Sequence, residues 1–243
     1  MRLLHRKLSR LAPSIALLAL GLGLGASGTL LVQSTTTPST ANEPAEPTKR
    51  SPPKLTTALL LEGEPSLGNA RAPLTIVEFS DFECRYCQQF HQTVLPNLKK
   101  QYIQTGLVRF IHKDLPLPFH RQALPAAAAA RCAGEQNKYW TTYGALFDGQ
   151  SCLQCKGVVA IASERGVDAN TLQACMNRDA TKALINANRS EAQLHGIRAT
   201  PTFVIGPTRS DDTHRGKIVE GALPWPQFKM MLDEELKALS GST

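Results

Sequence analysis

Two cysteines separated by two residues, Cys84 and Cys87, are the side chains whose type and spacing point most directly to chemistry. A pair with this spacing can close into a small disulfide. The apolar run 74–83 that precedes them predicts a buried strand ending in a turn, after which Cys84 would open a helix. A helix N-terminus offers unpaired N–H groups and a positive dipole end, which stabilise the reactive thiolate. The pair is therefore a candidate site of thiol-disulfide exchange, with Cys84 as the exposed sulfur and Cys87 as its internal partner.

Four further cysteines, Cys132, Cys152, Cys155 and Cys175, lie in the second half of the chain. Cys152 and Cys155 repeat the two-residue spacing of the first pair. Three connectivities are possible for four cysteines, and the spacing does not choose among them. Structural disulfides, a second redox pair and a zinc site of four thiolates all remain open, although zinc would compete with oxidation outside the cytoplasm.

The N-terminus has the pattern of an export segment. Arg2, Arg6, Lys7 and Arg10 lie in a stretch without acidic residues, and the apolar run 11–33 that follows has no charged side chain. The pattern predicts that residues 1–33 are either a cleaved signal peptide or an N-terminal membrane anchor, and we favour the anchor. Without these four charges the formal net charge of +7 falls to +3, and no basic cluster with interleaved aromatics remains, so we expect no nucleic-acid partner.

A polar, proline-rich segment without aromatics, residues 34–54, separates this region from the rest of the chain. Such a composition cannot bury enough apolar surface to order itself, so we expect a disordered linker. The folded unit is expected at residues 55–243, on the periplasmic side of the membrane, where disulfides persist.

Within that unit the predicted elements alternate between strand and helix and then become helical. A strand, a helix and a second strand in succession predict a βαβ unit with a parallel strand pair, and Pro96 should kink its helix. An all-helical insertion follows at about residues 118–196. The elements expected around it are strands at 74–79, 107–111, 202–205 and 217–220, a helix at 84–101 and a closing amphipathic helix at 224–239.

Three stretches together resemble DsbA-type thiol-disulfide oxidoreductases. They are Glu-Phe-Ser-Asp-Phe-x-Cys-x-x-Cys at 78–87, Cys-Ala-Gly-Glu-Gln-Asn-Lys-Tyr-Trp at 132–140, and Ile-Arg-Ala-Thr-Pro-Thr-Phe-Val-Ile-Gly at 197–206. The resemblance covers about residues 60–239. It implies an α/β thioredoxin fold, in which helices flank a central mixed β-sheet, with an inserted all-helical subdomain.

The resemblance also implies substrate-binding residues around the cysteine pair. Thr200 and Pro201 would form a cis-proline loop that faces the pair, whereas a trans proline would merely start a strand. Arg85 and Tyr86, between the two cysteines, depart from the family, in which proline more often takes the first place. A cation beside Cys84 would favour thiolate and an oxidising pair, unless Arg85 points into solvent, where its charge is screened.

Two ionisable residues match family positions with a catalytic role. Glu78 lies inside an apolar strand, where an unpaired carboxylate would be costly, although the period of a one-sided strand could also turn it outward. The resemblance favours a buried Glu78, paired with Lys113 from the second strand, that relays protons for Cys87.

The resemblance finally implies a function and a set of partners. We expect a disulfide-donating oxidase of exported, cysteine-containing proteins, monomeric, with a membrane redox partner, no metal and no cofactor beyond the Cys84–Cys87 disulfide. For the other cysteines we favour structural disulfides Cys132–Cys175 and Cys152–Cys155, since some relatives have a bridge that resembles the outer pair. The alternatives are a reductase or isomerase with the same site, or a chaperone-like binding module without catalysis.

Overall fold

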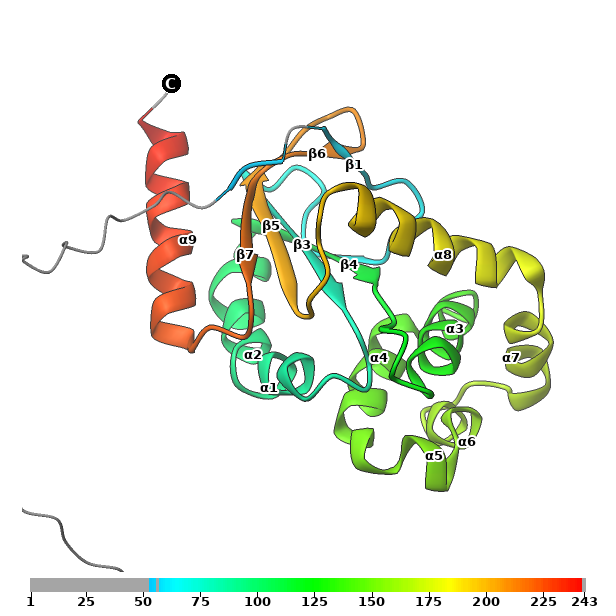
Figure 1. The fold of residues 1–243 in the computed structure, drawn as a ribbon. Coiled ribbons are helices and arrows are strands. Elements are labelled where there is room, and N and C mark those ends of the chain that lie inside the picture. Colours follow the sequence, from blue (N-terminus) through cyan, green and yellow to red (C-terminus); the bar gives the residue numbers. More distant parts are fainter. Residues whose placement is uncertain (1–52, 56, 242–243) are drawn as a thin grey trace, which may run out of the picture. The chain divides into compact units, whose positions relative to one another are not determined.

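The computed structural model describes residues 53–55 and 57–241 (Figure 1). The predicted export segment and nearly all of the predicted linker lie outside the described residues, so both stay predictions. Within the described ranges, no helix is both long and apolar enough to cross a bilayer.

A five-stranded mixed sheet forms the centre of the described unit. Strands β3 (Leu74–Ser80) and β4 (Val108–Asp114) pair in parallel, which confirms the expected βαβ unit. The other pairings are antiparallel, and the strand order is β2 (Ser66–Leu67), β4, β3, β5 (Thr202–Pro207) and β7 (Lys217–Glu220). Strands β1 (Leu59–Leu60) and β6 (Thr213–His214), which the sequence patterns did not predict, form a separate antiparallel pair.

Both faces of the sheet are buried, because every residue of β3 is buried and its side chains alternate between the faces. One face carries Ile76 and Phe203 and packs against α1 (Arg85–Thr93) and α9 (Trp225–Ser240). The opposite face carries Val77 and Phe79 and packs against Ala192 of α8 (Asp179–Leu194). Figure 1 shows α1 and α9 on one side of the strands and α8 on the other, as expected for helices that flank a sheet.

The helix after β3 is interrupted near Pro96, as predicted. Helix α1 ends at Thr93, and Pro96 lies in the first two positions of α2 (Leu95–Leu98). A proline is tolerated there because an N–H at the start of a helix has no hydrogen-bond partner within the helix. A π-helical turn, η1 (Lys99–Ile103), completes the crossover to β4. The proline therefore separates the short helix of the cysteine pair from the rest of the crossover.

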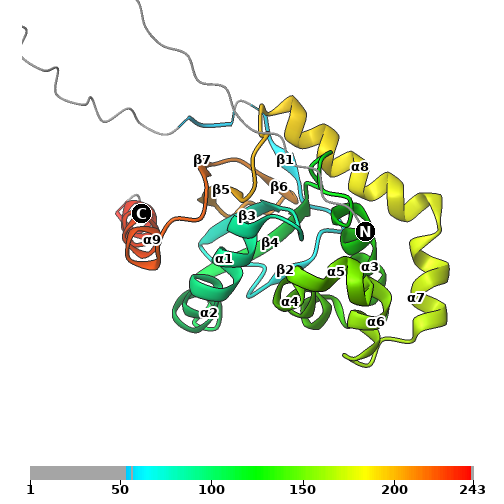
Figure 2. The same cartoon turned by 60° about the horizontal axis from the view of Figure 1, so that its bottom comes forward.

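The helical insertion is built around the alanine-rich helix α3 (Ala123–Gly134), of which residues 126–130 are buried. Small side chains let neighbouring helices approach closely, and Figure 2 shows α4 and α6 near α3. The elements that follow α3 are α4 (Tyr139–Asp148), the 3-10 turn η2 (Gln150–Cys152), α5 (Leu153–Lys156), α6 (Val158–Ser163), α7 (Ala169–Met176) and α8.

Two disulfides cross-link the insertion, and they differ in setting. Cys132–Cys175 joins α3 to α7 inside an apolar cluster and spans a sequence separation of 43. Cys152–Cys155 spans a separation of only 3 between η2 and α5. In the chain-entropy model the long loop contributes about 4 kcal/mol to stability and the short loop about 2 kcal/mol. The first is therefore the stronger structural cross-link.

Candidate active site

Cys84 and Cys87 lie at the carboxyl end of β3, where the chain turns into α1. Cys84 is the N-cap residue of α1 and accepts its first helical hydrogen bond, from the Gln88 N–H at 3.1 Å. Both cysteines are free thiols. Cys84 is 7% exposed and Cys87 is fully buried, so Cys84 is the more accessible sulfur but is less exposed than expected.

The cis Thr200–Pro201 peptide bond lies in the loop that faces this thiol pair. Cys84 Sγ lies 3.2 Å from the Thr200 carbonyl oxygen, to which the protonated thiol donates a hydrogen bond, although 116 positions separate the two residues. The fold therefore brings together the four central residues of the expected site, Cys84, Cys87, Thr200 and Pro201.

Hydrogen bonds lower the pKa of Cys84 from an ordinary 9.0 to about 5. The largest contribution comes from the Cys87 side chain, and further contributions come from the Thr200 side chain and the backbone N–H groups of Cys87 and Tyr86. Burial acts in the opposite direction, since it disfavours the charged form, but it does not prevail. Cys84 is therefore a thiolate at neutral pH.

Burial raises the pKa of Cys87 well above its ordinary value, and the Cys84 and Glu78 charges nearby add to the effect. Glu78 is itself fully buried, which raises its pKa from 4.5 to about 8. One of its carboxylate oxygens accepts a hydrogen bond from the Tyr143 hydroxyl at 3.0 Å, and the other has no partner among the described residues. The Ser80 hydroxyl stabilises the charged forms of both Glu78 and Cys87, so it lies close to each. Glu78 is thus an uncharged proton donor beside the buried thiol at pH 7.

The expected pairing of Glu78 with Lys113 is wrong. In the β3–β4 register Lys113 lies opposite Phe79, so its side chain leaves the sheet on the face opposite to Glu78. There its Nζ contacts Glu64 Oε1 at 3.1 Å and Glu191 Oε2 at 2.6 Å. Lys113 therefore belongs to a buried ionic cluster that ties β4 to α8, away from the thiols.

The turn that carries Cys84 is tethered to the start of the helical insertion. The buried carboxylate of Asp81 accepts hydrogen bonds from the Leu117 N–H at 2.7 Å and from His120 Nδ1 at 2.8 Å. Glu83 Oε2 accepts one from the Ala123 N–H at 2.8 Å, at the N-terminus of α3, where a negative charge is favourable. Sequence reasoning missed both carboxylates, although their place directly after the strand was a signal.

A second tether comes from Gln150, in the turn η2. Its Nε2 donates hydrogen bonds to the carbonyl oxygens of Phe82, at 2.8 Å, and of Cys84, at 3.0 Å. Nothing in the sequence pattern marked this residue. It holds the helical insertion directly against the backbone of the reactive cysteine.

Exposed side chains lie next to the thiols. Arg85 rests its guanidinium 5.4 Å from the centre of the Tyr86 ring, and Tyr86 is 53% exposed. The groups that lower the pKa of Cys84 are the hydrogen-bond donors already described, and Arg85 is not one of them. Phe119, which is 72% exposed, packs edge-on against the His120 ring and so borders the same turn.

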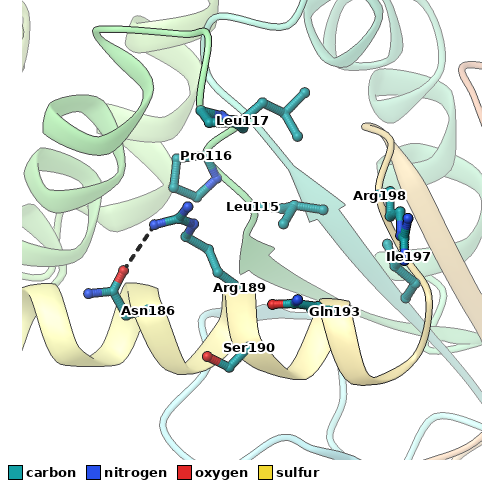
Figure 3. A pocket seen from close by; sticks show the side chains of 10 residues that line it. Leu115, Pro116, Leu117, Asn186, Arg189, Ser190, Gln193, Ile197 and Arg198 are labelled. Carbon is teal, nitrogen blue, oxygen red and sulfur yellow. Dashed lines mark hydrogen bonds between the residues drawn. The ribbon is translucent and has the colours of Figure 1, made fainter.

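A pocket of about 420 Å³ opens beside this turn, between residues 115–118 and the end of α8 (Figure 3). Arg189 extends from α8 toward Pro116 and donates a hydrogen bond to Asn186 Oδ1 at 3.2 Å. Arg198, on the opposite wall, lies two residues before Thr200. The pocket lining includes neither thiol, and Leu115 and Ile197 belong to the apolar cluster on the sheet face opposite to the thiols, so the pocket is separate from the cysteine pair. No group of three or more His, Cys, Asp or Glu side chains in the described part of the chain could hold a metal ion.

Comparisons with known proteins agree with this geometry. The thioredoxin family model matches residues 61–234. Disulfide bond formation protein D of Bacillus subtilis is 23% identical over 184 residues, which cover 73% of this chain and 79% of that protein. A putative protein-disulfide oxidoreductase of Rickettsia conorii is 27% identical, and the match spans 57% of this chain but only about half, 52%, of that longer protein. The crystal structure of Wolbachia pipientis α-DsbA1 superposes with a TM-score of 0.65 at 24% identity, over 76% of this chain and 96% of that one.

Proposed function

This chain belongs to the thioredoxin family, as a DsbA-like protein thiol-disulfide oxidoreductase, and we propose that it works as an oxidase that donates the Cys84–Cys87 disulfide to exported proteins. The observation that carries the direction is the opposed effect of the site on its two thiols, with the pKa of Cys84 at about 5 and that of Cys87 raised. A site that stabilises one thiolate stabilises the reduced enzyme, and so favours transfer of the disulfide to a substrate.

The reaction requires two successive exchanges. A substrate thiolate attacks Cys84 Sγ of the closed pair, the bond to Cys87 breaks, and Cys87 leaves with the electron pair and takes up a proton. Glu78, uncharged at pH 7, is placed to supply that proton. A second substrate thiolate then attacks the substrate sulfur of the mixed disulfide, and Cys84 leaves as a thiolate. The substrate loses two electrons and the enzyme gains them.

The size of the effect follows from the pKa of Cys84. At pH 7 a thiol with an ordinary pKa of 9.0 is almost fully protonated, whereas Cys84 is ionised. The two units between the Cys84 pKa of about 5 and pH 7 favour the reduced enzyme by about 3 kcal/mol, or roughly 60 mV in a two-electron couple. A shift of this size makes the reduction potential of the pair more oxidising than that of an unperturbed dithiol.

Two assays test the function. We expect the Cys84–Cys87 pair, equilibrated with glutathione buffers, to be mostly reduced in mixtures that leave an unperturbed dithiol oxidised, and the oxidised protein to speed disulfide formation in a reduced, unfolded substrate. Cys84→Ala should abolish the second activity. A strongly reducing potential together with insulin reduction would instead indicate a reductase. A binding module would show neither activity, with Cys84 intact or replaced.

The site of action is proposed to be the exported side of the membrane. The four basic residues and the uncharged run 11–33 support export, and six cysteines suit a compartment where disulfides persist. A membrane redox partner would reoxidise the pair. Expressed with its N-terminus intact, the chain should be found outside the cytoplasm. Sedimentation with membranes at full mass would favour the anchor, a soluble chain shorter by the first residues would favour cleavage, and retention in the cytoplasm would refute export.

A further inference from the structure

The disulfide Cys152–Cys155 has a setting that a structural cross-link does not require. Cys132 and Cys175 are 1% and 4% exposed and lie within an apolar cluster. Cys155, in contrast, is exposed and Cys152 is partly exposed. External thiols can therefore reach the second disulfide without any opening of the fold, whereas the first is shielded.

The same disulfide stabilises the fold less than the buried bridge does. It closes a loop with a sequence separation of 3, so it removes about half as much entropy from the unfolded chain as the bridge with a separation of 43. Both its cysteines also belong to short elements, η2 and α5, that local hydrogen bonds already hold. Global stability therefore accounts less fully for this disulfide than for Cys132–Cys175.

The turn that contains Cys152 also contacts the backbone of the active site. Turn η2 runs from Gln150 to Cys152, and Gln150 donates its two side-chain hydrogen bonds to the carbonyl oxygens of Phe82 and Cys84. Cys84 is the N-cap of α1, and the N–H groups at that helix start lower the pKa of its thiol. A change in the backbone of η2 would thus move the Gln150 side-chain amide, which hydrogen-bonds to the backbone of Cys84.

We propose that Cys152–Cys155 is a second redox-active disulfide, opened by small thiols of the glutathione type, and that Gln150 conveys its state to Cys84. One thiolate attacks a sulfur of the pair and forms a mixed disulfide, and a second thiolate releases the reduced pair and forms glutathione disulfide. The pair gains two electrons and two protons, and two glutathione molecules are oxidised. With the pair open, η2 loses its covalent closure, and Gln150 holds the Cys84 turn less firmly.

The first part of the test counts opened pairs in the full chain. The protein is equilibrated in glutathione buffers of increasing reducing strength, quenched with acid and alkylated, and each cysteine is quantified by peptide mass spectrometry. We expect Cys152–Cys155 to open within the range of these buffers while Cys132–Cys175 stays closed, which makes the buried bridge an internal control. If Cys152–Cys155 stays closed in every buffer that leaves Cys132–Cys175 closed, the proposal is overturned.

The second part of the test measures how the state of Cys152–Cys155 affects the pKa of Cys84. In the reduced active site, the double variant Cys152→Ser with Cys155→Ser should shift the pH midpoint of Cys84 alkylation upward from that of the parent chain, because the donors that stabilise the thiolate are held less firmly. Gln150→Ala should produce the same change, and combining it with the double variant should add nothing. Gln173→Ala, on an exposed face of α7, is the matched control and should leave the midpoint in place.

Each outcome decides the proposal. An unchanged Cys84 midpoint in the double variant refutes the coupling through Gln150, provided that urea unfolding shows the variant to be folded. An additive effect of Gln150→Ala refutes the shared route. Neither readout uses substrate oxidation, so this inference can fail while the proposed oxidase function stands, and the reverse is also possible.

Discussion

Cys84 of the reduced protein is expected to react with iodoacetamide along a titration curve with its midpoint near pH 5, while Cys87 stays unreactive across the same range. The pKa of Cys84 is lowered to about 5, and that of Cys87 is raised by burial and by nearby negative charge. The experiment follows the alkylation rate from pH 3.5 to 9 and locates the modified residue by mass spectrometry.

The midpoint is more informative than the rate at pH 7. A thiolate with a low pKa is present at nearly full occupancy at pH 7, but its intrinsic nucleophilicity falls with its pKa, and the two effects nearly cancel there. Near pH 5.5 an ordinary thiol is almost entirely protonated, so Cys84 should react roughly tenfold faster or more than a free cysteine. A midpoint above pH 8 would contradict the proposed thiolate and the oxidising direction that rests on it.

The same shift predicts how the stability of the reduced protein depends on pH. Because the pKa of Cys84 is lower in the folded than in the unfolded chain, its contribution is complete above pH 9 and is lost as the pH falls through about 5. At pH 7 it amounts to about 3 kcal/mol. Cys84→Ala, which also abolishes exchange, should remove this pH dependence, whereas Glu164→Gln, an exposed site, should leave it unchanged.

Glu78→Gln is expected to make the protein more stable at pH 7 and slower in exchange. The folded pKa of Glu78 is raised to about 8 by burial, so the carboxyl group costs nothing below its unfolded pKa of 4.5 and increasingly disfavours folding as the pH rises toward 8. At pH 7 the uncharged glutamine should recover up to about 3 kcal/mol, an upper limit because the site can relax around the charge. The gain should vanish at pH 4.

The rate of thiol-disulfide exchange, in contrast, should fall in Glu78→Gln. Glutamine keeps the oxygen that accepts the Tyr143 hydrogen bond but cannot transfer a proton to or from Cys87. We expect the rate of the step that releases Cys87 to fall roughly tenfold or more, as for the loss of a positioned acid–base group. Urea unfolding at pH 4 and pH 7, with stopped-flow reduction of the Cys84–Cys87 disulfide, measures both effects. Equal stability of the two proteins at pH 7 would indicate that Glu78 is not buried as described.

Local sequence rules predicted the elements of this fold, and failed where a choice depended on register. The strand before Cys84, the break at Pro96 and the parallel pair of β3 and β4 follow from patterns within a few residues. Lys113 does not, because a shift of one residue along β4 decides which face of the sheet it enters. Its partners Glu64 and Glu191 come from segments 49 and 78 positions away, which no local pattern could indicate.

The sequence by itself determined that this protein carries a reactive cysteine pair at the start of a helix, a strand with a carboxyl group in it, and a distant Thr-Pro segment of the same family type. Only the tertiary structure decided what surrounds the sulfur of Cys84. The Thr200 carbonyl and the Gln150 amide reach the Cys84 residue from 116 and 66 positions away, and burial beside Tyr143 sets the charge of Glu78. Reactivity depends on hydrogen bonds and desolvation at one point in space, and those are properties of the packed chain rather than of neighbours in sequence.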